Sequence, residues 1–150
     1  MLVKEICTAN VVCCAPQATA IDAARAMRQK HVGDVVVVDD PDRERIPLGV
    51  VTDRDLAIEV LGNARDPAKT ALATIMRKPV VIAREGEDIS QVIERMRSQG
   101  VRRIPVVHDD DGTVVGIVTL DDLIRVLVGE MHSLIDTETK GQRREQIARR

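Results

Sequence analysis

Aromatic side chains are missing from this sequence, whose 150 residues include no Phe, Trp or Tyr. The stacking on nucleobases that many single-strand-binding proteins use is therefore excluded. Basic residues are in no excess either, since 22 Lys and Arg face 24 Asp and Glu for a net charge of −2. Without a positive field the chain is poorly suited to nucleic acid or to an anionic membrane. We expect neither as its partner.

Long apolar runs are also missing, and no segment approaches the length of a membrane span. The first ten residues, MLVKEICTAN, contain no apolar core of a secretory signal peptide, so we expect a cytoplasmic protein. Its three cysteines, Cys7, Cys13 and Cys14, form no CxxC motif. Adjacent residues point to opposite faces of a strand, so Cys13 and Cys14 are poorly placed to share a metal. The cysteines are interpreted as reduced thiols, and no metal site is expected.

One seven-residue phrase occurs twice, as GVVTDRD from position 49 and as GIVTLDD from position 116, 116 − 49 = 67 residues apart. The similarity extends upstream. VKEICTANVVCC (3–14) aligns with LATIMRKPVVIA (72–83), and TAIDAARAM (19–27) aligns with DISQVIERM (88–96), both 72 − 3 = 69 residues apart. The first copy thus carries two extra residues in its polar loop, DDPDRERIP. Such duplication indicates a repeat architecture.

Each copy shows the same order of hydrophobic patterns, which predicts β-α-β-β-α twice. The predicted strands are Val11–Cys14, Val35–Val38 and a strand ending at Thr52, then Val80–Ala83, Ile104–Val107 and a strand ending at Thr119. HDDDG (108–112) is interpreted as a hairpin turn rather than a cation site. We expect repeats at 3–62 and 72–135, a linker at 63–71, and a polar, frayed tail at 136–150. One unit of about sixty residues is near the lower limit of independent stability, so the two should pack into one α/β (α+β) module.

Together, these repeats resemble a tandem pair of cystathionine-beta-synthase (CBS) domains, the Bateman module, over residues 3–135. The resemblance is carried by GVVTDRDL, GIVTLDDL, GVRRIPVV and the short strands VVCC and VVIA. It implies pseudo-two-fold packing and a non-enzymatic regulatory module. The implied ligand is AMP, ADP, ATP, NAD or S-adenosylmethionine, bound in the cleft between the repeats. It also implies homodimers that pair through their helices, and no required cofactor.

The Thr-x-x-Asp phrase suits a nucleotide because it falls where a strand becomes a helix, a position that favours anions. Thr52 and Thr119 can donate a hydroxyl hydrogen bond to phosphate, and the Asp55 and Asp122 carboxylates can accept from ribose hydroxyls. Gly49 and Gly116 would allow close approach of backbone or ligand. Further phosphate candidates are Arg54 and Arg103, with Arg102 beside it. The candidates for an apolar adenine slot are Val11, Val12, Val80, Val81, Val36 and Ile104.

Several alternatives remain open at this point. Thr-x-x-Asp before an apolar run is also a capping box, which needs no ligand. A structural dimerisation module with vestigial sites is the alternative function, and an enzyme is less favoured because the chain contains no P-loop, dinucleotide fingerprint or nucleophile–base signature. The apolar stripe of the last helix favours a homodimer, and an unknown protein target would fit a regulatory module. Arg54 against Asp121 predicts tighter phosphate binding at the first copy, although Arg102 and Arg103 replace Gly33 and Asp34 in the second.

Overall fold

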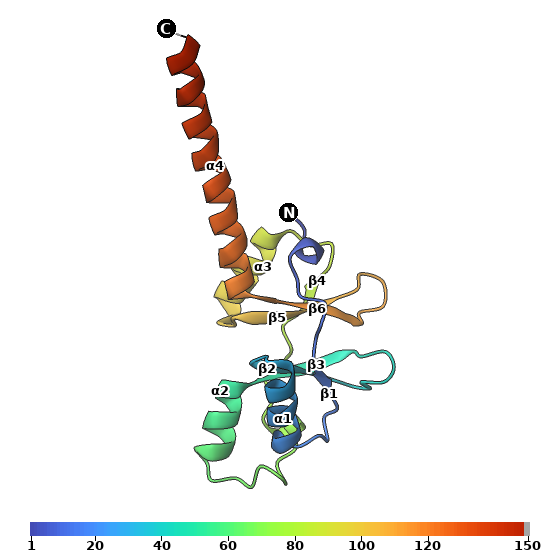
Figure 1. Ribbon diagram of the computed structural model, residues 1–150. Coiled ribbons are helices and arrows are strands. Elements are labelled where there is room, and N and C mark those ends of the chain that lie inside the picture. Colours follow the sequence, from blue (N-terminus) through green and yellow to red (C-terminus); the bar gives the residue numbers. More distant parts are fainter. Residues whose placement is uncertain (149–150) are drawn as a thin grey trace.

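The computed structural model describes residues 1–148, in which two copies of one arrangement follow each other along the chain (Figure 1). The first copy contains η1 (Val3–Glu5), β1 (Cys13–Cys14), α1 (Ala20–Lys30), β2 (Asp34–Val38), β3 (Pro47–Thr52), α2 (Asp53–Asp55) and the π-helical η2 (Leu56–Leu61). The second contains η3 (Leu72–Thr74), β4 (Ala83–Arg84), α3 (Ile89–Gln99), β5 (Arg103–Val107), β6 (Val114–Thr119) and α4 (Leu120–Ala148). The predicted β-α-β-β-α order is confirmed in both copies.

The two sheets have the same strand order and the same pairing register. In each, a two-residue strand pairs in parallel with the next strand, which pairs antiparallel with the third, in the orders β1-β2-β3 and β4-β5-β6. Asp34 lies opposite Thr52, and Arg103 lies opposite Thr119. A register shift falls at the matching place in each hairpin, between Val37 and Val38 and between Val106 and Val107. Strands β1 and β4 are shorter than predicted, which leaves the preceding valine pairs outside the regular strands.

The first segment of each repeat packs into the core of the other repeat. Val3 is fully buried in the core of the second repeat, and Leu72 is fully buried in the core of the first. Backbone hydrogen bonds fix the exchange: Thr8 and Ile117 bond reciprocally at 2.9 and 3.0 Å, and the Leu72 amide donates to the Ala18 carbonyl at 2.8 Å. Neither repeat therefore has a complete core without the other, which explains why two small units form one module.

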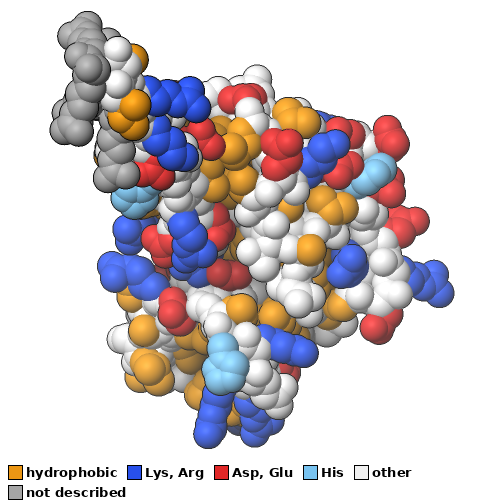
Figure 2. Space-filling model, turned by 45° about the horizontal axis from the view of Figure 1, so that its top comes forward, with side chains coloured by type: hydrophobic (Ala, Val, Ile, Leu, Met, Phe, Trp, Pro, Cys, Tyr) orange, Lys and Arg blue, Asp and Glu red, His pale blue; other side chains and the backbone are white. Residues whose placement is uncertain are grey.

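A third apolar cluster joins the two sheets. Val36 and Val38 of β2 pack with Val114 and Ile117 of β6, and Val11 and Cys13 border them. Cys14 packs instead with the core of the first repeat, so adjacent cysteines do face opposite sides. On the face shown in Figure 2, acidic and basic side chains are interspersed rather than gathered into a large field of one sign.

The last helix differs from its prediction. The polar segment from residue 136 was expected to fray, but α4 continues through it to Ala148 and projects away from the sheets (Figure 1). The segment is rich in Glu, Gln, Lys and Arg, which favour helix. The hydroxyls of Thr137 and Thr139 donate to the carbonyls of Ser133 and Ile135 one turn earlier. Among residues 1–148, no helix has both the length and the apolar character needed to cross a membrane.

Candidate functional site

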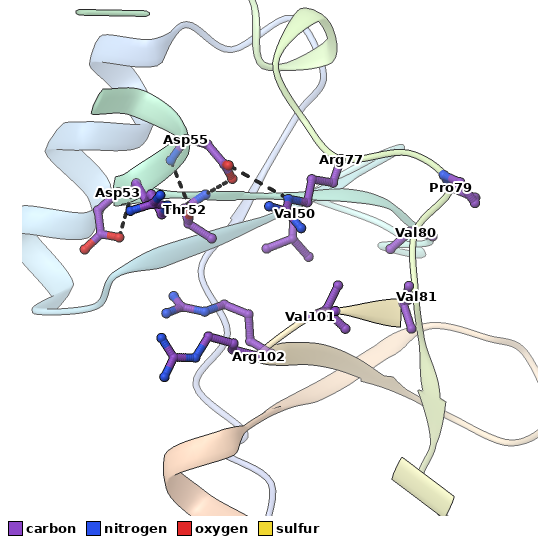
Figure 3. Close-up of a pocket in the computed structure, with 13 residues that line it drawn as sticks. Val50, Thr52, Asp53, Asp55, Arg77, Pro79, Val80, Val81, Val101 and Arg102 are labelled. Carbon is purple, nitrogen blue, oxygen red and sulfur yellow. Dashed lines mark hydrogen bonds and ion pairs between the residues drawn. The ribbon is translucent and has the colours of Figure 1, made fainter. Parts of the chain in front are cut away.

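Two pockets lie between the repeats, and each takes its walls from both. Pocket 1, of about 400 Å³, joins the Thr-x-x-Asp phrase of the first repeat to two segments of the second (Figure 3). Its lining residues are Val50, Thr52, Asp53, Arg54, Asp55, Arg77, Pro79, Val80, Val81, Gly100, Val101, Arg102 and Arg103.

Pocket 2, of about 370 Å³, is the reverse combination, with the phrase of the second repeat against two segments of the first. Its lining residues are Thr8, Asn10, Val11, Val12, Val32, Gly33, Asp34, Arg102, Arg103, Ile117, Thr119, Leu120, Asp121 and Asp122. Nearly every residue of one pocket matches a residue of the other at the offsets of the sequence repeat. The pockets are therefore pseudo-symmetric, and the exchange of first segments builds both.

The Thr-x-x-Asp phrases form capping boxes in both repeats. The Thr52 amide donates to Asp55 Oδ2 at 2.9 Å, and the Asp55 amide donates to Thr52 Oγ1 at 3.1 Å. In the second copy, the Thr119 amide and hydroxyl donate to Asp122 Oδ2 at 2.9 and 2.7 Å. The capping interpretation is thus confirmed. The same residues also line the pockets, so capping does not remove them from the ligand space.

One carboxylate oxygen of each aspartate stays outside the capping box. Asp55 Oδ1 lies 4.0 Å from Arg77 Nε, at the outer limit of an ion pair. Asp122 Oδ1 takes part in no hydrogen bond or ion pair with the residues that the structure describes. Because a carboxylate oxygen can accept two hydrogen bonds, these oxygens retain acceptor capacity.

Four of the six predicted slot valines and isoleucines line the pockets, and two do not. Val80 and Val81 line pocket 1, and Val11 and Val12 line pocket 2. In Figure 3, Val80, Val81 and Val101 gather at the end of pocket 1 away from Asp53. The remaining two predicted residues, Val36 and Ile104, line neither pocket, because they are fully buried in apolar clusters.

The arginines of the two pockets differ in how they are engaged. Arg103 Nη1 contacts Asp34 Oδ2 at 2.6 Å and donates to the Gly33 carbonyl at 3.0 Å. This pair joins equivalent positions of the two repeats, 103 − 34 = 69 residues apart. Burial raises the pKa of Asp34, and the Arg103 guanidinium offsets part of that rise. Arg103, predicted to bind phosphate, lines both pockets but is already paired.

The two repeat glycines serve packing between the repeats. A Cβ on Gly49 would lie 2.8 Å from Met76 Sδ, and one on Gly116 would lie 2.7 Å from Cys7 Sγ. Met76 and Cys7 are equivalent residues of the exchanged segments. The expected close approach therefore occurs, but against a side chain of the other repeat.

Sequence reasoning missed the pocket residues that the exchange supplies. Arg77 and Pro79 in pocket 1, and their equivalents Thr8 and Asn10 in pocket 2, line the pockets although no motif marks them. The signal available was the alignment of 3–14 with 72–83, in which both pairs occupy matching positions.

The cysteines are unpaired and partly buried, and burial raises the pKa of the Cys7, Cys13 and Cys14 thiols. A raised pKa lowers the fraction of reactive thiolate. Within residues 1–148, no group of His, Cys, Asp and Glu side chains is arranged to hold a metal ion.

The family model of the CBS domain matches this chain twice, at residues 3–62 and 72–129. The chain is a tandem pair of CBS domains. A relative from Methanopyrus kandleri, an uncharacterised protein, is 35% identical over 124 residues, which cover 83% of this chain and 61% of that protein. The chain thus spans less than two thirds of that relative's length.

Solved CBS structures share the fold. The CBS domain pair of protein MJ0100, in complex with 5′-methylthioadenosine and S-adenosyl-L-methionine, superposes with a TM-score of 0.73 at 28% identity, covering 87% of this chain and 98% of that one. A hexameric CBS-CP12 protein from bloom-forming cyanobacteria gives 0.72 at 30% identity, covering 83% and 69%. These CBS neighbours support a regulatory ligand-binding module.

Proposed function

We propose that this CBS pair is a regulatory module that binds adenosine-containing ligands in its two composite pockets. The observation that carries the proposal is the construction of each pocket. A Thr-x-x-Asp phrase of one repeat, with an acceptor oxygen to spare, faces an apolar valine pair of the other repeat. A nucleoside has the complementary chemistry, because its hydroxyls are donors and its base has flat apolar faces.

Within pocket 1, the positions of the side chains support one binding mode. The base would lie against Val80, Val81 and Val101, and the ribose hydroxyls would donate to Asp55 Oδ1. Arg77 lies near the same carboxylate and would approach the phosphate end. The MJ0100 complex supports the ligand class, because both of its ligands contain adenosine. AMP, ADP and ATP are the ligands that we favour here, ahead of NAD and S-adenosylmethionine.

The state of the pockets would be passed on through association of α4. Several large apolar side chains of this helix are exposed: Ile124, Leu127, Val128, Met131, Leu134 and Ile135. Leu123, from the same predicted stripe, is instead buried in the core of the second repeat. The exposed residues recur at helical spacing over about three turns and form one apolar strip, the α4 strip. Because α4 begins at Leu120, and both Leu120 and Thr119 line pocket 2, a homodimer or a protein target held by this strip would contact the same helix that borders the ligand.

A thermal-shift experiment tests the proposal. The wild type should gain melting temperature with AMP, ATP or NAD, and the double variant Asp55→Ala/Asp122→Ala should lose most of that gain. Because both aspartates are also caps, Asp22→Ala is the matched control. It breaks the capping box of α1, where Asp22 bonds Thr19, outside both pockets. This control should lower the melting temperature and keep the full ligand-induced rise.

Two outcomes of the thermal-shift experiment would contradict the proposal. If no adenosine-containing ligand raises the melting temperature of the wild type, the pockets do not sense these ligands. The alternative, a structural dimerisation module with vestigial sites, would then hold, and it too is favoured by the exposed α4 strip. If the double variant keeps the full rise, the ligand binds elsewhere.

A further inference from the structure

Pseudo-symmetry makes the two pockets directly comparable, residue by residue. Their apolar positions match closely: Val80 and Val81 correspond to Val11 and Val12. Their Thr-x-x-Asp phrases also match. The differences are concentrated in charged side chains, so the two pockets should recognise a common nucleoside core and differ in what they accept beyond it.

Pocket 1 has more cations than pocket 2, because Arg54 and Arg77 line it alone. Arg54 lies where pocket 2 has Asp121, Arg77 lies where pocket 2 has Thr8, and Arg102 matches Gly33. Within the described part of the chain, the Arg54 and Arg102 guanidiniums make no hydrogen bond or ion pair, and Arg77 contacts Asp55 only at 4.0 Å. Three arginines are therefore available to a ligand of pocket 1, and two of them, Arg54 and Arg77, do not line pocket 2. Guanidinium groups favour phosphate oxygens because they present paired donors in a plane.

Pocket 2 has two fewer cations and one more anion than pocket 1, whose own carboxylates are Asp53, which matches Leu120, and Asp55. Its lining includes Asp34, Asp121 and Asp122, and its arginines are Arg102 and Arg103, both shared with pocket 1. Arg103 is neutralised by Asp34 at 2.6 Å. A phosphate entering this pocket would approach the Asp121 carboxylate, where pocket 1 offers a guanidinium. The negative charges of the phosphate and of the Asp121 carboxylate repel each other, and this repulsion disfavours an anionic ligand in pocket 2.

We infer that the two pockets divide adenosine ligands by charge. Pocket 1 takes a phosphorylated nucleoside, and pocket 2 takes an adenosine derivative without phosphate, either uncharged or cationic at its 5′ end. This inference rests on the proposed function and adds to it, because the module would then compare two ligand classes. The composite construction also removes the conflict over Arg102 and Arg103. Both residues line both pockets, and Arg103 is paired with Asp34, so neither one sets the two pockets apart and the preference rests on Arg54 and Arg77.

Methyl NMR of the valine-labelled protein separates the two pockets, because Val80 and Val81 report pocket 1 while Val11 and Val12 report pocket 2. AMP and the uncharged 5′-methylthioadenosine are the probes. AMP should saturate the pocket 1 methyls at a concentration about ten- to a hundredfold below that needed at pocket 2. 5′-Methylthioadenosine should lose this preference and saturate the pocket 2 methyls at far lower concentration than AMP does.

Exchanging the charges at the matched positions Arg54 and Asp121 tests the inference more directly. Asp121→Arg gives pocket 2 the cation of pocket 1 and should strengthen AMP binding there by about tenfold or more, and Arg54→Asp should weaken AMP at pocket 1 to a similar extent. Glu130→Arg is the control, since it makes the same charge change on exposed α4, and it should move neither titration.

Two results would overturn the inference, and they are distinguishable. If AMP saturates both valine pairs at equal concentration, or Asp121→Arg behaves like Glu130→Arg, the division by charge fails while adenosine binding stands. If neither probe shifts either pair, the proposed function fails together with the inference.

Discussion

Asp55 and Asp122 each use one carboxylate oxygen for the fold and leave the other for the proposed ligand. In each, Oδ2 closes a capping box, and Oδ1 stays outside it. The sequence predicted both uses: the Thr-x-x-Asp motif by itself favoured the cap, and the resemblance to CBS domains favoured the ribose contact. The separate placement of the two oxygens makes the cap compatible with the proposed ribose contact.

The repeat glycines give a prediction about stability. Gly49→Ala and Gly116→Ala should each lower the free energy of unfolding by about 1–3 kcal/mol, because the added Cβ meets Met76 or Cys7 of the exchanged segment. Gly129→Ala in α4 is the control. Its Cβ would meet nothing within 4 Å, so the change should be neutral or slightly stabilising. Urea unfolding measures all three. Equal stability of Gly49→Ala and Gly129→Ala would contradict the packing.

At the scale of elements, the repeat order and the strand–helix junctions followed from hydrophobic periodicity and the duplicated phrase. The exchange of first segments did not, because an apolar residue such as Val3 fits the core of either repeat equally well by pattern alone. Arg77 and Thr8 were missed as pocket residues for that reason. The extension of α4 was missed because a polar helix without a buried face gives no periodic signal.

The start of α3 predicts a pH dependence. Hydrogen bonds from Ser90 and from the Met1 ammonium group lower the pKa of Asp88 from 3.8 to about 2. A depressed carboxyl pKa contributes stability above the ordinary value, and this contribution is lost as the pH falls from 3.8 through about 2. The stability advantage of the wild type over Asp88→Asn should therefore shrink as the pH falls from 3.8 toward about 2, as measured by urea unfolding. A constant difference would show that the charge of Asp88 contributes nothing.

Association through α4 gives a second prediction for an element. Leu134→Glu should weaken self-association, because it places a charge within the exposed α4 strip. Ser133→Glu is the matched control, since Ser133 lies on the face of the helix away from the α4 strip. Light scattering coupled to size exclusion should show a dimer for the wild type and for Ser133→Glu, and a shift toward monomer for Leu134→Glu. A monomeric wild type at micromolar concentration would contradict the dimer.

For the whole molecule, the contact between Asp34 and Arg103 joins equivalent points of the two repeats and borders both pockets. Arg103→Ala would leave the partly buried Asp34 carboxylate unpaired, at a cost of about 1–3 kcal/mol in the free energy of unfolding. Adding Asp34→Asn should restore part of the loss, because the unpaired charge is then gone. Urea unfolding of the single and double variants measures this, and an additive loss in the double variant would show that the pair is not coupled.

Each pocket is built by both repeats, and calorimetric titration of AMP tests this most directly. Thr52→Ala in the first repeat and Val80→Lys in the second should both weaken the same tight AMP site by about tenfold or more, since each removes or blocks one wall of pocket 1. Their equivalents, Thr119→Ala and Val11→Lys, should leave that site intact. If Thr52→Ala weakens AMP binding together with Val11→Lys rather than Val80→Lys, each pocket belongs to a single repeat. The composite site would then be wrong.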